Sequence, residues 1–107
     1  MLVSTQIQDN RLNIRLSGEL DHHAARQAME EIAEAIDCHL PLDCCIDMSA
    51  ISFMDSSGIA VILNAKKRMA EIDGRFWLEN VPAQALKVLT VSGVYRIVEM
   101  IKTAEAS

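Results

Sequence analysis

The chain of 107 residues is 50% hydrophobic and 23% charged, which is typical of one globular domain with an aliphatic core and excludes a disordered or fibrous chain. Acidic residues number 15 against 10 basic ones, giving a net charge of −5. This charge argues against a nucleic-acid partner, because phosphate binding needs a face rich in Lys and Arg. We expect a single domain over residues 1–107 that contacts a protein or a small ligand and makes no direct contact with nucleic acid.

The cysteines and the short apolar runs indicate the cellular compartment of the protein. Cys38, Cys44 and Cys45 are odd in number and include an adjacent pair, so no disulfide framework is expected. The N-terminus lacks the build of a signal peptide, and no apolar run approaches the roughly 18 residues that cross a bilayer. We therefore expect a cytoplasmic protein without membrane association.

The chain begins with two alternating segments. Residues 2–8 and 11–17 each place apolar and polar side chains in turn, which predicts two strands. Asp9 and Asn10 lie between them and tolerate left-handed conformations. A tight hairpin that makes the pair antiparallel is the expected connection.

A helix and a buried strand are predicted next. Residues 18–21 turn the chain, and Asp21 is a good N-cap for a helix whose apolar positions recur at helical spacing. The helix must end before Pro41, which cannot continue its hydrogen bonds. Residues 42–48 are short and apolar enough to form a buried parallel strand.

The second half of the chain continues the alternation. The first turns of its first helix are apolar nearly all round, which indicates either deep burial or contact with a partner. In order, we expect a helix over 59–72, a strand over 75–80, a helix from Pro82 to Val91, a strand within 95–101, alone or followed by a short helix, and a polar tail over 102–107.

This order predicts an α/β fold with a mixed, mostly parallel sheet, an N-terminal antiparallel hairpin strand and alternating helices. In such sheets, functional residues gather where strands end and helices begin. The expected neighbourhood contains Asp21, His22, Asp55, Ser56 and Ser57.

The turn from Asp55 to Gly58 has two interpretations that local chemistry leaves open. In one, a serine caps the second helix and Gly58 eases the bend. In the other, a serine accepts phosphate, since a helix N-terminus offers N–H donors to an anion. A phosphoserine would add roughly −1.5 to −2 charges beside Asp55, and near Asp21 across the rim. Repulsion would then spoil any partner surface there.

Several segments carry a family resemblance. They are Phe53-Met54-Asp55-Ser56-Ser57-Gly58 before an aliphatic helix, Asp47-Met48-Ser49, Ser17-Gly18-Glu19-Leu20-Asp21-His22-His23, and Ser92-Gly93. Together they resemble the STAS domain of bacterial anti-sigma factor antagonists over nearly the whole chain. The Glu19 to His23 segment is most similar to the sporulation branch, the antagonist of the anti-sigma F factor.

The resemblance implies partner switching. The unphosphorylated protein would bind an anti-sigma factor that is also a serine kinase, and so free a sigma factor. Phosphorylation would reverse this, and a serine phosphoprotein phosphatase would restore the active form. By position the phosphoacceptor is Ser57, with Ser56 less favoured, and no cofactor or metal is implied. The expected partner-binding residues are Asp21, His22, Asp55, Ser56, Ser57, Gly58 and Ile59.

Three other functions fit some of these residues. A ligand- or lipid-sensing module of a larger assembly would hold an anion on the N–H groups of the serine turn. A hydrolase would use Ser57 with a nearby histidine, but nothing in the sequence specifies an oxyanion site. A zinc site built from Cys38, His39, Cys44 and Cys45 lacks the spacing of structural zinc motifs. We expect no enzymatic activity.

Overall fold

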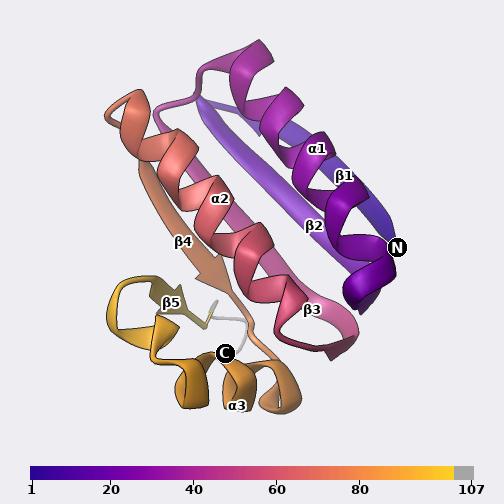
Figure 1. Cartoon of the computed structure of the whole chain (residues 1–107). Helices are drawn as coiled ribbons and strands as arrows, with labels where there is room; N and C mark the ends of the chain where they lie inside the picture. The colour runs from indigo at the N-terminus through magenta and orange to yellow at the C-terminus, as the bar shows by residue number, and fades with distance from the viewer. Residues whose placement is uncertain (103–107) are drawn as a thin grey trace.

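A single mixed sheet organises the computed structural model, which describes residues 1–102 (Figure 1). Two long helices, α1 and α2, lie side by side over one face of this sheet, and α3 lies at the end toward which β4 points. In chain order the elements are β1 (Leu2–Gln8), β2 (Arg11–Leu20), α1 (His22–His39), β3 (Asp43–Met54), α2 (Ser57–Glu71), β4 (Arg75–Glu79), α3 (Ala83–Ser92), the 3-10 helix η1 (Val94–Arg96) and β5 (Glu99–Ile101).

The strands follow one another across the sheet in the order β1-β2-β3-β4-β5. β1 pairs with β2 in antiparallel fashion, and the remaining pairs are parallel. Asp9 and Asn10 form the hairpin with φ values of 54° and 64°, in the left-handed region that these residues tolerate. The predicted α/β class, the hairpin and the mostly parallel sheet are confirmed.

The core lies between the sheet and the two long helices. Leu12, Ile14 and Leu16 of β2 point into it with at most 1% of their surface exposed. Successive side chains of a strand alternate between faces, so Trp77, next to the buried Leu78, lies on the face that α1 and α2 leave open. The fold is thus a two-layer α/β sandwich in which loops join the ends of the strands to the helices.

Two strands are longer than the sequence pattern predicted. β2 runs to Leu20 instead of ending at residue 17, and β3 runs to Met54 instead of ending at residue 48. The register between them shifts twice, and each shift places one extra residue on β3. The prediction ended the first strand at residue 17 because it placed residues 18–21 in a turn, and it ended the second at the last residue of a short, mostly apolar run. The two extra residues on β3 interrupt its alternation beyond that run.

The remaining differences lie at element ends. α2 begins at Ser57, two residues before the predicted start, and the half-buried Ile59 begins a turn whose Val61 and Ile62 are fully buried. Most of the apolar surplus at this helix start therefore belongs to the core. The strand predicted over 95–101 forms only as the three-residue β5, and the short helix η1 precedes it instead of following it. Of the predicted polar tail, residues 103–107 lie outside the described residues.

Candidate functional site

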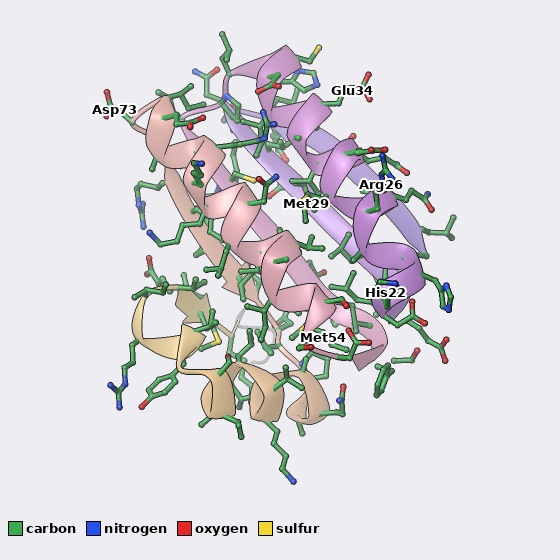
Figure 2. The ribbon with its side chains drawn as sticks, in the orientation of Figure 1. His22, Arg26, Met29, Glu34, Met54 and Asp73 are labelled. Atoms are coloured by element: carbon green, nitrogen blue, oxygen red, sulfur yellow. The ribbon has the colours of Figure 1, made fainter. Side chains whose placement is uncertain are left out.

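β2 and β3 end side by side, and this common end forms a rim. Leu20 pairs with Met54 in parallel register, and the N–H of Asp55 donates to the carbonyl of Leu20 at 3.4 Å. Asp21 and Asp55 are the next residues along the two chains. The structure therefore brings the starts of α1 and α2 together at this rim, where Figure 2 shows His22 and Met54 at the same end of the molecule.

Asp21 caps α1. Its Oδ1 accepts the backbone N–H of His23 at 3.0 Å and that of Ala24 at 3.0 Å, while its own backbone is extended. The predicted cap is confirmed, and it fixes a negative charge at the positive end of the helix. His22, the next residue, is exposed at the rim.

Asp55 performs the same role for α2. Its Oδ1 accepts the N–H of Ser57 at 2.8 Å, while Ser56, in helical conformation, makes no side-chain capping bond within the described part of the chain. The interpretation in which a serine caps this helix is therefore wrong for Ser56, because the carboxylate of Asp55 satisfies the donor. Ser56 is exposed and Ser57 is half-buried.

The backbone N–H groups at the start of α2 already have partners. Besides the bond from Ser57 to Asp55, the N–H of Gly58 donates to the carbonyl of Asp55 at 3.0 Å, and that of Ile59 donates to the carbonyl of Ser56 at 3.1 Å. An anion at this helix start would have to displace the carboxylate of Asp55. The turn is therefore poorly suited to hold a phosphate through its N–H groups, although helix starts in general do so.

Gly58 allows α2 to approach the strand ends closely. A Cβ atom at this position would lie 2.5 Å from Cγ of Met54 and 3.0 Å from Cδ2 of Leu20, and both of those side chains are fully buried. Gly58 is itself buried. This glycine therefore positions Ser57 by permitting tight packing and offers no side chain to a partner.

Two residues of the rim escaped the sequence-based prediction of the site. Phe53, the residue before Met54, has 41% of its surface exposed although it lies in β3. Gln84 in the first turn of α3 accepts the N–H of Met54 at 2.8 Å and donates to its carbonyl at 2.8 Å. An aromatic residue directly before the turn is a usable signal for Phe53. Nothing in the sequence relates Gln84 to a strand thirty residues earlier.

The geometry does not assemble the alternative sites. Asp55, the aspartate of the hydrolase alternative, accepts the backbone N–H of Ser57, and His39 lies at the opposite end of α1 from the rim. Cys44 and Cys45 are buried, and burial, above all, raises the pKa of each thiol to about 12. No group of three or more His, Cys, Asp or Glu residues within 1–102 is arranged to hold a metal ion. In the same range, no helix is long and apolar enough to span a membrane.

Comparison with known proteins places the chain in a family. A model of the STAS domain matches residues 3–107. The chain belongs to the STAS domain family. The anti-sigma F factor antagonist of Lysinibacillus sphaericus is 37% identical over 81 residues, which cover 76% of this chain and 69% of that relative.

Solved structures agree with this membership. The anti-sigma factor antagonist SpoIIAA in its unphosphorylated form is 30% identical with a TM-score of 0.83, and the match covers 97% of this chain and 90% of that one. The Bacillus cell fate determinant SpoIIAA in its phosphorylated form is 30% identical with a TM-score of 0.75, covering 97% and 93%. The resemblance drawn from the sequence and the STAS-like fold are confirmed.

Proposed function

We propose that this STAS domain is an anti-sigma factor antagonist of the sporulation type. In its unphosphorylated form it binds an anti-sigma factor that is also a serine kinase, and so releases a sigma factor. Phosphorylation of Ser57 ends the binding, and a serine phosphoprotein phosphatase restores it. The protein acts in the cytoplasm as a binding module and catalyses no reaction. The names of its relatives, one of them described in unphosphorylated and phosphorylated forms, support this proposal.

The observation that carries the proposal is the hydrogen bond of 2.8 Å between the Asp55 carboxylate and the N–H of Ser57. It holds a negative charge next to the proposed phosphoacceptor. A phosphate on Ser57 would meet this charge, with Asp21 also at the rim, and would find the nearby N–H groups engaged. Repulsion and the cost of desolvating a dianion would then oppose docking of any partner on this rim.

The partner surface that we propose consists of the rim residues. The exposed members, His22 and Ser56, and the half-buried Ile59 would contact the partner directly. Asp21, Asp55 and Ser57 are half-buried and would contribute charge and hydrogen bonds. Gly58 has no side chain to contact a partner and would shape the surface only by letting α2 pack closely on the strand ends. The exposed Phe53 extends this surface with an aromatic side chain of a type that is enriched in protein interfaces.

The engaged N–H groups argue against the ligand-sensing alternative at this site. It required free N–H groups at the start of α2, and those of Ser57, Gly58 and Ile59 donate to other groups. The partner-switching function requires only accessible hydroxyls and a surface that added charge can spoil. We therefore propose partner switching and do not propose anion binding.

Phosphorylation is tested directly with the purified protein, the anti-sigma factor kinase of the same organism and ATP. Mass spectrometry is expected to find one phosphate on Ser57. The Ser57→Ala variant should remain unmodified and still bind the kinase, and the neighbouring Ser56→Ala variant, as the matched control, should be modified like the parent. A protein that takes up no phosphate, or takes it up at another position, would contradict the assignment.

The effect of charge is tested by comparing two variants of similar shape. Ser57→Asp should bind the kinase at least about tenfold more weakly than the parent, since like charges in a contact cost more than 1.4 kcal/mol. Ser57→Asn lacks the charge and should lose much less affinity in the same titration. Equal binding by the Asp variant and the parent would refute the repulsion mechanism.

A further inference from the structure

Gln84 forms an unusual connection between α3 and the end of β3. β4 pairs with β3 only as far as Asp47, so the part of β3 beyond that point has no β4 residue beside it. At the last residue of β3, the carboxamide of Gln84 takes the place of a neighbouring strand. Its Oε1 accepts the N–H of Met54 and its Nε2 donates to the carbonyl of Met54, each at 2.8 Å.

Met54 directly precedes the turn that contains Ser57 and packs against it. Its side chain is fully buried and lies directly under Gly58, as the 2.5 Å approach of a Cβ atom shows. The next residue, Asp55, holds the N–H of Ser57. A carboxamide that fixes both backbone groups of Met54 therefore fixes the start of the chain segment that presents Ser57.

We propose that Gln84 is a positioning residue for the switch, through which α3 sets the geometry of the Asp55 to Ser57 turn. This inference rests on the proposed function of the rim. Gln84 acts through Met54 and need not touch the partner. Because coupling between two sites is reciprocal, phosphate on Ser57 and partner binding at the rim both change the hydrogen bonds of Gln84.

The chemistry of the side chain makes the proposal specific. A carboxamide presents a donor and an acceptor in one plane, which a carboxylate or an alkyl group does not. Gln84→Glu keeps an acceptor for the N–H of Met54, but at neutral pH the carboxylate has no hydrogen to donate to the carbonyl of Met54. Protonation of this glutamate at low pH restores a donor. Gln84→Met has similar length and neither function.

The first experiment uses the free protein. We compare amide hydrogen exchange of Met54, Asp55 and Ser57 in the parent, Gln84→Glu, Gln84→Met and the control Lys87→Ala, which alters an exposed residue one turn further along α3. The exchange of these amides should be about tenfold faster in Gln84→Met, as expected for loss of hydrogen bonds of ordinary strength. It should be unchanged in Lys87→Ala, and protection in Gln84→Glu should rise as the pH is lowered toward 4. Unchanged exchange in both Gln84 variants would overturn the connection.

The second experiment measures kinase binding and the rate of phosphorylation. The Gln84→Met variant should bind about tenfold more weakly, with the loss appearing mainly in KM. Gln84→Glu should recover parent-like affinity at low pH, a rescue that a merely structural residue would not show. Faster exchange with parent-like binding and phosphorylation would overturn the positioning role.

The two experiments separate this inference from the proposed function. If the parent neither binds the kinase nor accepts phosphate, the proposed function fails, while the exchange data still decide whether Gln84 holds the turn. If the parent behaves as proposed and the Gln84 variants match it, only the positioning role fails. A melting temperature of Gln84→Glu close to that of the parent shows that differences between them are not due to unfolding.

Discussion

Asp21 combines a structural role and a proposed binding role in one carboxylate. Its Oδ1 accepts two backbone N–H groups at the start of α1, and the carboxylate lies at the rim. Asp21→Ala should lower the free energy of unfolding by about 1 kcal/mol, the usual cost of a lost cap. Asp21→Asn keeps an acceptor for these N–H groups and removes only the charge, so its unfolding curve in urea should stay close to that of the parent.

The affinity for the kinase then shows whether the partner recognises the charge of Asp21. We expect Asp21→Asn to bind more weakly than the parent although it is as stable, because the proposed surface presents the charge of Asp21. Parent-like affinity of Asp21→Asn, measured beside Ser57→Asp in the same titration, would show that the partner does not recognise this charge.

Gly58 tests how tightly the rim is packed. In Gly58→Ala the new methyl group would meet Cγ of the buried Met54, so we expect a loss of about 1–3 kcal/mol in the free energy of unfolding. Shortening Met54 to Ala removes the clash. The double variant Gly58→Ala/Met54→Ala should therefore lose less stability than the sum of the single variants in urea unfolding. Additive losses would mean that the two side chains do not meet.

At the scale of single residues, the sequence predicted the cap at Asp21, whose role is local, and the partner-binding and phosphoacceptor roles stay predictions. Asp21 is adjacent to the helix that it caps, and the serines lie within a recognisable turn. Gln84 could not be predicted, because its hydrogen bonds join segments that are far apart in the chain. The capping role of Asp55 was missed since serine and aspartate are both good caps, and only the conformation of Ser56 decides between them.

At the scale of elements, β3 shows why strand lengths were predicted too short. The predicted strand was a short, mostly apolar run that ends at Met48, whereas the buried positions beyond it, Ile51 and Met54, follow at a spacing of three among polar and exposed residues. The first extra residue lies where the side chain of Asp47 accepts the N–H of Ser49 at 3.0 Å, a local bond that competes with strand pairing. Pairing with β2 continues on both sides of this bulge, so the strand ends six residues later than its pattern indicates.

The bulge also gives β3 a measurable dependence on pH. Partial burial raises the pKa of Asp47, but the hydrogen bonds from Ser49 and Asn80 outweigh it and leave the pKa below its ordinary value. A depressed pKa contributes stability at neutral pH that is lost as the pH falls through the folded-state pKa. Asp47→Asn should therefore be less stable than the parent at pH 7. The difference in free energy of unfolding should shrink below about pH 4, where the unfolded carboxyl begins to bind its proton. A difference independent of pH would contradict this account.

At the scale of the whole molecule, the rim lies apart from the hydrophobic core. The rim lies at the ends of β2 and β3, and the core extends along the faces of these strands beneath α1 and α2. The sequence pattern predicted a core along the strands and a rim at their ends, because strand alternation and helix signals recur along the whole chain. Changes of charge at Ser57 should therefore alter the rim without disturbing the core, whereas Gly58→Ala disturbs both.

The rate at which the cysteines are labelled shows whether a change at the rim also affects the core. Cys44 and Cys45 lie buried in the central strand, and burial raises the pKa of each thiol to about 12, while Cys38 is exposed. Iodoacetamide at pH 8 should label Cys38 quickly and the other two only when the whole domain unfolds, because the thiolate is the reactive form. Labelling of the buried pair should keep the parent rate in Ser57→Asp. In Gly58→Ala it should rise about tenfold for each 1.4 kcal/mol of lost stability, whatever the state of the rim. Faster labelling of this pair in Ser57→Asp would mean that charge at the rim destabilises the core. The weaker kinase binding of that variant would then be due to loss of structure and not to repulsion.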